Sequence, residues 1–476
     1  MSTSTATSSV LSGSLLASLL SDDVFIPSEP NSLEEAGLST TMVDGLACKY
    51  LMMVGSASGH QIADHLCLPF RIVEHLFRQL RQRQIIVHSA SAQLNDYYYA
   101  LTDQGRQRAQ GMMDACGYVG PAPVPLGEYI LSVDAQTIRA ESPKRDALQR
   151  AFSNISVAPD LLDQLGPAIN SGAGLFLYGA PGNGKTTLAA RITMCFGQSI
   201  WIPRTLTEDG QFLKLYDAAY HRAEEEADGS LLKSTTHDRR WIKIRRPTVV
   251  VGGELTMDAL EIRHDPATNV GEAPLQLKSN CGCLLIDDFG RQRIEPSELL
   301  NRWIVPLENR QDFLTLSTGK KIQVPFEQLI IFSTNLDPGD LTDEAFLRRI
   351  PYKVEVRDPD AAEFRSLFER LAPKFHCDYS VSAVDHLLEK HYAGAGRPLR
   401  RCHPRDLLFQ IRNYCTYNDL PMEMTEANFD RVVRSYFTAL SGRTDVPADA
   451  IVPGENPPAR SEQPSVDLGQ TEIAPA

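Results

Sequence analysis

Two short runs of residues have the types and spacing needed for phosphate chemistry. The first is GAPGNGKTT at 179–187, directly after the apolar run Leu175–Tyr178. It fits the pattern GxxxxGK[ST], in which glycines let consecutive backbone N–H groups face an anion and a helix begins where the run ends. The lysine would reach the β- and γ-phosphates, and the hydroxyl of the residue after it would ligate Mg²⁺. The run therefore predicts a nucleoside triphosphate site, with these candidate binding residues: Gly179, Ala180, Pro181, Gly182, Asn183, Gly184, Lys185, Thr186 and Thr187.

The second run is CLLIDDFG at 283–290, an apolar segment that ends in two carboxylates. A buried parallel strand of this kind can hold a metal ion and polarise a water molecule at its tip. Asp287 is the candidate Mg²⁺ ligand, together with Thr186. Asp288 is the candidate residue that orients or deprotonates the attacking water.

Three further segments supply polar side chains that could complete such a site. The apolar run Leu329–Ser333 is followed by Asn335, whose amide could reach the γ-phosphate or its water. The segment DEAFLRRI places Arg348 and Arg349 near a predicted helix end, and CHPRDLL places Arg405 at the start of a later helix. The candidate catalytic residues are thus Asp288, Asn335, Arg348, Arg349 and Arg405.

With these residues in this order, the chain from about Arg145 to Phe437 resembles the AAA+ ATPases. The resemblance implies an α/β P-loop core, with a parallel sheet between helices, followed by a C-terminal helical lid. It assigns Walker A to the first run, Walker B to the two aspartates, sensor 1 to Asn335, sensor 2 to Arg405 and the arginine finger to Arg348 or Arg349. It also implies ATP and Mg²⁺ as cofactors. The expected assembly is a ring, usually a hexamer, in which the finger enters the neighbouring site.

Within that family the segments between the motifs are similar to MoxR-type ATPases, magnesium chelatases and enhancer-binding activators. Glu254–Leu275 corresponds to their insertion in the second helix, and Phe313–Pro325 to their hairpin before sensor 1, with a turn at Thr318-Gly319. The sigma-contacting GAFTGA sequence and a C-terminal helix-turn-helix are absent, so a sigma-factor activator is not predicted. Asp288 stands where Glu is usual, which keeps slow hydrolysis and an ATP-driven switch open.

The N-terminal part, 33–116, shows three helical patterns, two β-favouring runs and a closing helix that starts near Thr102. This order, and the sequence YYYALTDQGRQRA, resemble the winged-helix domains of bacterial regulators. The predicted helix Phe70–Arg83 carries several arginines, so DNA binding is possible by analogy with helix-turn-helix docking. Nearby acidic residues nearly cancel their charge, which favours docking to a protein. Both interpretations stay open.

The remaining segments complete the predicted domain plan. We expect disordered ends at 1–31 and 441–476, a Pro/Gly linker at 117–127, a nucleotide-binding core at 145–355 and a helical lid at 356–440. Within the core, the amphipathic pattern of Gln211–Ala227 predicts a helix.

Composition excludes some classes of protein. The 476 residues carry a net charge of −13, which argues against a protein that mainly coats nucleic acid. Nine scattered cysteines indicate reduced thiols and a cytoplasmic protein. The apolar run Val10–Leu20 is too short to span a membrane and lacks the basic flank of a signal peptide. The spacing of four lid residues fits no standard zinc pattern; they are His376, Cys377, Cys402 and His403.

The sequence therefore predicts an ATP-hydrolysing, Mg²⁺-dependent AAA+ protein that forms a ring and remodels a protein client in a chaperone-like way. The competing hypothesis is a DNA-binding ATP switch, or a regulator of transcription or replication, that uses the winged helix.

Overall fold

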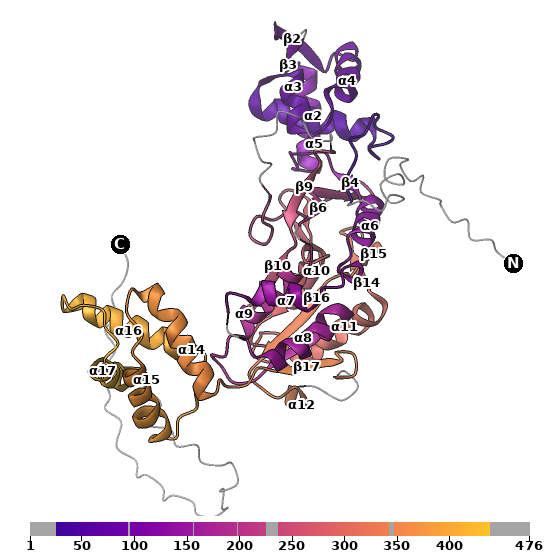
Figure 1. The fold of residues 1–476 in the computed structure, drawn as a ribbon. Helices are drawn as coiled ribbons and strands as arrows, with labels where there is room; N and C mark the ends of the chain where they lie inside the picture. Colours follow the sequence, from indigo (N-terminus) through magenta and orange to yellow (C-terminus); the bar gives the residue numbers. More distant parts are fainter. Residues whose placement is uncertain are drawn as a thin grey trace, which may run out of the picture.

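The computed structural model of the chain describes residues 25–93, 96–155, 157–197, 199–224, 237–341 and 347–437. These parts form an elongated molecule in which an N-terminal unit, a central region of sheets and a C-terminal helical unit follow one another (Figure 1). Most of the two ends predicted to be disordered lies outside the described residues, as does the run Val10–Leu20. In the part of the chain that is described, no helix combines the length and the apolar character needed to cross a bilayer.

The N-terminal unit contains the helices and strands that its sequence predicts, and one more strand. Its elements are α2 (Thr40–Val54), β1 (Ser56–Ser58), α3 (Gly59–His65), α4 (Phe70–Gln82), β2 (Ile86–Ser91), β3 (Tyr97–Leu101) and α5 (Asp103–Ala115). The strands form an antiparallel sheet in the order β1-β3-β2. The predicted start of the closing helix is confirmed, because the Thr102 side chain accepts a hydrogen bond from the Gly105 amide and caps α5.

Five parallel strands form the core sheet, in the order β10-β13-β16-β5-β17. They are β5 (Leu175–Tyr178), β10 (Thr248–Val251), β13 (Cys283–Ile286), β16 (Leu329–Thr334) and β17 (Tyr352–Glu355). β13 and β16 are buried along their whole length, which explains their unbroken apolar sequences. The strands predicted at the second run and before Asn335 are confirmed.

Helices cover both faces of the core sheet (Figure 1). On one face, α7 (Arg145–Phe152), α8 (Pro159–Ser171) and α9 (Lys185–Ile192) share a buried cluster with Leu177 and Leu285. On the other face, α11 (Pro296–Asn309) packs Trp303 against Phe332. The predicted fold class, an α/β core in which a parallel sheet lies between helices, is therefore confirmed.

A second five-stranded sheet, in the order β11-β12-β8-β7-β4, packs against the N-terminal unit. Its strands are β4 (Val124–Pro125), β7 (Thr205–Glu208), β8 (Gln211–Lys214), β11 (Arg263–Asp265) and β12 (Val270–Glu272). Phe212 of β8 and Val270 of β12 belong to the same buried cluster as the core of the N-terminal unit. The sheet is thus assembled from distant stretches of chain.

The helix predicted at Gln211–Ala227 is wrong. β7 and β8 form an antiparallel hairpin whose two-residue loop is Asp209-Gly210, with φ of 47° and 75°. An Asp-Gly pair between two β-favouring runs is a strong hairpin signal, and it outweighs a helical pattern in the residues that follow. Residues 225–236 lie outside the described part of the chain.

The segment Glu254–Leu275, expected to be an insertion, is built from short elements. It begins with a short 3₁₀ turn, η3 (Met257–Leu260), continues as β11 and β12, and ends where α10 (Leu275–Lys278) starts. β12 pairs with β8, so the insertion adds two strands to the second sheet.

The segment 117–127, predicted as a linker, is packed against its surroundings. Tyr118 is buried, and its hydroxyl donates a hydrogen bond to the Pro121 carbonyl at 2.7 Å and lies 2.9 Å from the hydroxyl of Thr205 in β7. β4 lies within this segment and pairs with β7, and α6 (Leu126–Ala135) begins near the end of the segment.

Arg240 joins the N-terminal unit to the second sheet. Its side chain is 1% exposed and donates to Asp238 and to the backbone carbonyls of Ala36 and Pro123, at 2.7 and 3.0 Å for the two carbonyls. A buried ion pair with further hydrogen bonds holds these three stretches in one arrangement.

The hairpin predicted at Phe313–Pro325, before Asn335, is confirmed. It consists of β14 (Gln311–Thr315) and β15 (Lys321–Pro325), and Gly319 in its turn has a φ of 82°. Its tip lies against the β7–β8 turn, where the Lys320 ammonium group is 2.6 Å from Asp209. A short ribbon of β6 (Ser199–Pro203) and β9 (Trp241–Arg245) completes this region.

The C-terminal unit is a bundle of helices, as predicted for the lid. The helices are α14 (Ala361–Leu371), α15 (Val381–His386), the π-helical η5 (Leu387–Ala393), α16 (His403–Tyr417) and α17 (Glu426–Phe437). Phe364, Phe368 and Phe429 lie at the centre of its buried cluster.

Candidate functional site

The glycine-rich loop connects β5 to α9 at the edge of the core sheet. Gly184 is the N-cap of α9 with a φ of 83°, and Gly182 has the same φ. Gly179 has a φ of 132°, and a Cβ atom built on it would lie 2.6 Å from the Val356 carbonyl oxygen. A residue with a side chain is strained at these positive φ values, so the loop favours glycine here. The amide groups at the start of α9 are left to face an anion.

Lys185 turns back over the loop. Its ammonium group donates to the carbonyl oxygens of Gly179 and Ala180, at 2.9 and 3.1 Å, and to Oδ1 of Asn335 at 2.7 Å. Burial lowers the pKa of Lys185, and the nearby carboxylates of Asp287 and Asp288 act in the opposite direction. The cation is therefore held among neutral oxygens that a phosphate group can replace.

Thr186 and Asp287 meet across the edge of the sheet. The Thr186 hydroxyl donates to Oδ2 of Asp287 over 2.8 Å and so links the first turn of α9 to the end of β13. A hydroxyl and a carboxylate are hard oxygen ligands of the kind that Mg²⁺ binds alongside water and substrate phosphates. The donor set and its place beside the glycine-rich loop fit this ion.

Asp288 adopts a left-handed backbone conformation with a φ of 49°. Such a conformation costs energy for a residue with a side chain and is common at functional sites. Hydrogen bonds fix the next residue, because the Phe289 amide donates to Ser333 and the Phe289 carbonyl accepts from Thr334. The chain is thereby bent, and the Asp288 carboxylate is turned toward β16.

Asn335 lies between the lysine and this carboxylate. Its Nδ2 is 3.1 Å from Oδ1 of Asp288, while its Oδ1 accepts from Lys185. This orientation of the amide follows from its neighbours, since an ammonium group must donate and a carboxylate must accept. The structure thus brings Lys185, Asn335 and Asp288 into one hydrogen-bonded series.

The lid contacts the loop directly. Asn183 is buried, and its Nδ2 donates to Oδ1 of Asp358 over 2.7 Å, while its Oδ1 accepts from the backbone amide of Arg401 at 3.3 Å. The Cys402 amide donates to the Gly182 carbonyl oxygen at 2.9 Å. Two residues of the loop, Gly182 and Asn183, are therefore hydrogen-bonded to the lid.

Arg405 does not take the place expected for sensor 2. Its side chain is 67% exposed and is bonded to its neighbour Asp406 at 2.9 Å. Arg400 is only 20% exposed, pairs with Asp358, and its charge contributes to the lowered pKa of Lys185. Sequence reasoning missed Arg400, because the segment GRPLRRCHPR offers four arginines and only the fold shows which one faces the loop.

The two finger candidates differ in their exposure. Arg348 is exposed, whereas Arg349 is partly buried and paired with Glu308 of α11 at 2.7 Å. Residues 342–346 lie outside the described part of the chain. The geometry of a single chain leaves both candidates open.

Residues 360–435 match the family described as "Domain of unknown function (DUF8689)". No curated protein matches the chain.

Several solved structures are similar at low identity. NtrX from Brucella abortus is 14% identical over 63% of this chain, with a TM-score of 0.39, and the match spans 59% of NtrX. A mutant RuvB of Thermotoga maritima is 13% identical over 63% of this chain and 73% of its own, with a TM-score of 0.33. A chain in a structure of the complex between the magnesium chelatase subunits BchI and BchD is 16% identical over 61% of this chain, with a TM-score of 0.32. The match spans 95% of that chain.

Proposed function

We propose that this protein is an AAA+ ATPase that hydrolyses ATP with the help of Mg²⁺. The observation that carries the proposal is the hydrogen-bonded series Lys185–Asn335–Asp288, which lies beside the Thr186–Asp287 pair. A phosphate-binding cation, a metal-binding pair and a carboxylate able to position water are thus gathered at one edge of the sheet.

The roles of the side chains follow from these contacts. Lys185 exchanges its carbonyl partners for phosphate oxygens, and Thr186 and Asp287 hold Mg²⁺, which neutralises charge on the phosphates. Asp288 orients the attacking water and accepts its proton, and Asn335 keeps that carboxylate in place. Arg400 supplies positive charge from the lid.

We also propose that the protein works as a ring, with six subunits as the expected number, and remodels a protein client. Arg348 or Arg349 would complete the neighbouring site. The hairpin of β14 and β15 supports contact with a client, because Phe313 on its outer face is 49% exposed while Leu314 is fully buried. All nine cysteines are free thiols, which supports a reducing compartment such as the cytoplasm.

The test is ATP turnover per subunit as a function of protein concentration. Turnover should rise to a plateau as subunits assemble, and the Arg348→Ala/Arg349→Ala double variant should stay inactive while still binding ATP. Lys185→Ala should lose ATP binding. A native chain whose turnover is independent of concentration contradicts the ring, and one that does not bind ATP contradicts the whole proposal.

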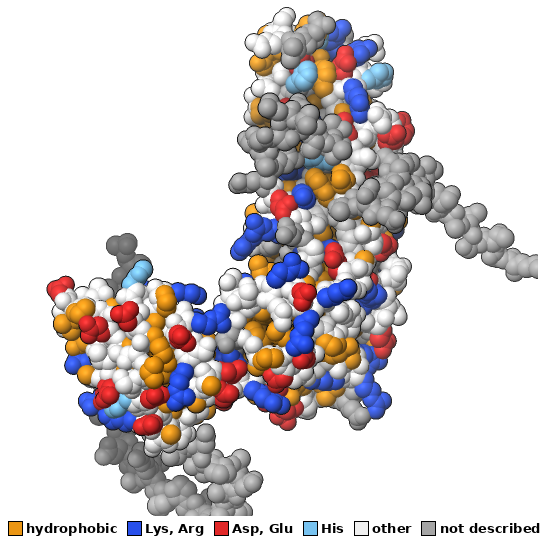
Figure 2. All heavy atoms as spheres, in the orientation of Figure 1, with side chains coloured by type: hydrophobic (Ala, Val, Ile, Leu, Met, Phe, Trp, Pro, Cys, Tyr) orange, Lys and Arg blue, Asp and Glu red, His pale blue; other side chains and the backbone are white. Residues whose placement is uncertain are grey.

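The alternative, a DNA-binding ATP switch, rests on the arginines of α4 and on Arg83, which follows it as the C-cap. Within the N-terminal unit, Arg78 pairs with Glu74 at 3.0 Å, Arg83 with Asp44 at 2.9 Å and Arg71 with the Pro30 carbonyl at 3.2 Å. Figure 2 shows basic and acidic side chains interspersed over the face drawn, with no separate basic stripe on the atoms coloured there. These observations support docking to a protein.

DNA binding has its own measurement. Affinity for duplex DNA that falls steeply with salt, and is lost in an Arg71→Ala/Arg78→Ala variant, would establish the switch instead.

A further inference from the structure

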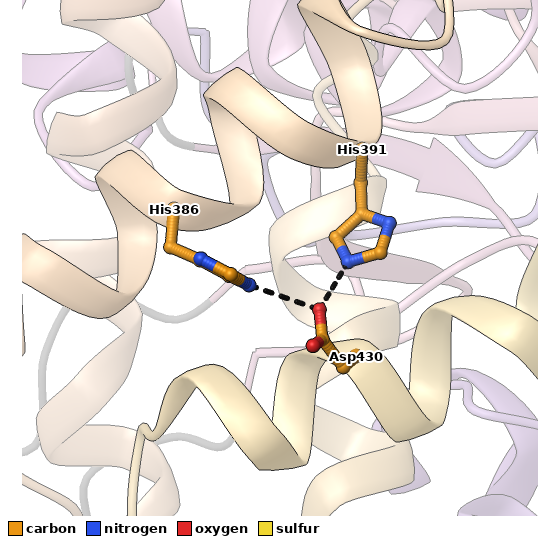
Figure 3. A group of neighbouring side chains, drawn as sticks. All are labelled: His386, His391 and Asp430. Carbon is orange, nitrogen blue, oxygen red and sulfur yellow. Dashed lines mark hydrogen bonds and ion pairs between the residues drawn. The ribbon is translucent and has the colours of Figure 1, made fainter.

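Three side chains of the lid converge at a point far along the chain from the glycine-rich loop (Figure 3). Oδ1 of Asp430, on α17, lies 2.9 Å from Nε2 of His386 and 2.5 Å from Nε2 of His391. The ligand atoms of the three residues all lie within 4.8 Å of one another. In the described residues, this is the one group of His, Cys, Asp and Glu side chains close enough to share a metal ion.

A local change in the helix brings the two histidines together. Five positions along a regular α-helix correspond to a rotation of about 500°, which would place them on faces about 140° apart. Between them the helix widens to the π form over Leu387–Ala393, which turns both imidazoles toward α17. Single π-helical turns cost stability and are frequent at functional sites. Leu387 and Leu388 anchor the widened turn in the buried cluster of the lid.

The surroundings divide the two carboxylate oxygens of Asp430 between different partners. The Lys390 ammonium group is 2.7 Å from Oδ2, which leaves Oδ1 to both imidazoles. On the far side of the His386 ring, Nδ1 is 3.4 Å from Oε2 of Glu426. A carboxylate behind a histidine ring is the usual partner of a metal-binding histidine, because it takes the other N–H and fixes the tautomer.

Without a cation, this arrangement requires a hydrogen on both Nε2 atoms, and both must point at the same oxygen. On its other side, Nδ1 of His386 faces a second carboxylate, that of Glu426, at 3.4 Å. A cation between the three ligand atoms removes this requirement, because neutral imidazoles then present lone pairs from Nε2.

From this geometry we propose that His386, His391 and Asp430 form a binding site for a divalent transition-metal ion, with Glu426 as the supporting carboxylate. Two imidazole nitrogens and one carboxylate oxygen are a donor set that suits Zn²⁺. At metal–ligand bonds of about 2.0–2.1 Å, tetrahedral ligands lie about 3.3 Å apart. The two distances from Oδ1 of Asp430 to the histidine Nε2 atoms would therefore widen by less than about 1 Å on binding. The side chains are 14–27% exposed, which leaves room for that shift and for water as a fourth ligand.

Such an ion would tie α17 to the widened helix and so brace the lid. The site does not depend on the proposed ATPase activity, because its ligands lie outside the Walker motifs. Lys390 places a positive charge near the ion and so lowers the affinity of the site for a cation.

The experiment uses the full-length, untagged protein after treatment with a chelator. Zn²⁺ affinity is measured by competition with a chromophoric chelator, and Co²⁺ is used as a spectroscopic probe. One equivalent of Co²⁺ should give the visible bands of a tetrahedral site with nitrogen and oxygen ligands. An intense sulfur-to-metal charge-transfer band instead would assign the bound ion to the cysteines and overturn the proposal.

Variants then locate the site. Asp430→Asn and His391→Asn should weaken Zn²⁺ binding by more than about 100-fold, and Glu426→Gln by about 10-fold, as expected for a supporting residue. His376→Asn is the matched control, because it removes a lid histidine outside the cluster at a φ of 56° that asparagine tolerates. Zn²⁺ should raise the Tm of the native and control chains and leave that of His391→Asn unchanged, with circular dichroism confirming that each variant is folded. Equal affinity in the native chain and in the folded Asp430→Asn or His391→Asn variant, or no binding by the native chain, would overturn the proposal and leave a cluster of ion pairs.

Discussion

The Cys402 amide donates a 2.9 Å hydrogen bond to the Gly182 carbonyl oxygen, so the lid and the glycine-rich loop are joined through their backbones. A methyl group on Gly182 would lie 2.5 Å from the Cys402 sulfur atom, whereas one on Gly184 would meet no atom within 4 Å. Both glycines have a φ of 83°. The two positions therefore separate backbone strain from contact with the lid.

Gly182→Ala should destabilise the nucleotide-free protein more than Gly184→Ala does. Each substitution adds the backbone strain of a left-handed residue, about 1–2 kcal/mol, and only the first one also pushes the lid away. Thermal unfolding without nucleotide is the measurement. Equal losses of Tm would show that the lid contact contributes nothing.

Asp288→Asn should lower kcat by at least about 100-fold and leave the Kd for ATP within a few-fold, because the amide keeps the shape but cannot accept the proton of the attacking water. Asparagine also tolerates the φ of 49° at this position. The exposed carboxylate of Asp340, on α12 (Pro338–Leu341), offers a control in Asp340→Asn, which should hydrolyse ATP normally. Full activity in the Asp288 variant would remove that residue from the mechanism.

Arg400→Ala should weaken ATP turnover by about 10- to 100-fold, the range expected when one charge-assisted hydrogen bond to phosphate is lost. Arg405→Ala should have little effect, because that side chain is exposed and bonded to Asp406. Steady-state kinetics of both variants shows which of the two arginines contributes to ATP turnover. The opposite pattern would return the sensor role to Arg405.

Arg240→Met should lower the free energy of unfolding by about 3–5 kcal/mol, since it leaves the buried Asp238 carboxylate without its partner. The neighbouring Arg239 pairs with Asp64 on the surface, where both side chains are at least 41% exposed. Arg239→Met should therefore cost no more than about 1 kcal/mol. Chemical denaturation compares the two, and similar losses would show that the buried pair does not anchor the N-terminal unit.

Acid should weaken the lid through His403. Burial, and then the nearby Arg400, lower the pKa of this histidine from 6.5 to about 4. In this interval the unfolded chain binds a proton that the folded chain does not, so the contribution of His403 is complete above pH 6.5 and is lost as the pH falls toward 4. The free energy of unfolding, measured from pH 7 to 4, should decline less steeply in His403→Gln than in the native chain. An unchanged slope would place the acid sensitivity elsewhere.

Local signals in the sequence predicted much of the fold. The glycine-rich run, the apolar strands that end in polar residues, the Thr102 cap and the Thr318-Gly319 turn each depend on neighbouring residues, and each element lies where it was expected. Lys185, Asn335 and Asp288 meet because β5, β13 and β16 are parallel and end at the same edge of the sheet.

Features that depend on distant contacts could not be predicted in this way. The second sheet pairs strands from distant parts of the chain, and no periodicity within one segment reveals its partners. The sequence does not show whether Arg400 or Arg405 faces the glycine-rich loop, because that depends on how the lid packs against the core. His386 and His391 have a spacing that an α-helix would place on different faces, and the π-helical turn that unites them has no signal of its own.

The second sheet also governs the order in which the chain can fold during synthesis. The hydrophobic cluster of the N-terminal unit includes Phe212 and Val270, and β4 at its end pairs with β7. Domains usually fold one after another as they leave the ribosome. Here the first unit emerges about 150 residues before Val270, so the part of its apolar surface that Phe212 and Val270 cover stays open to water until those residues have been made.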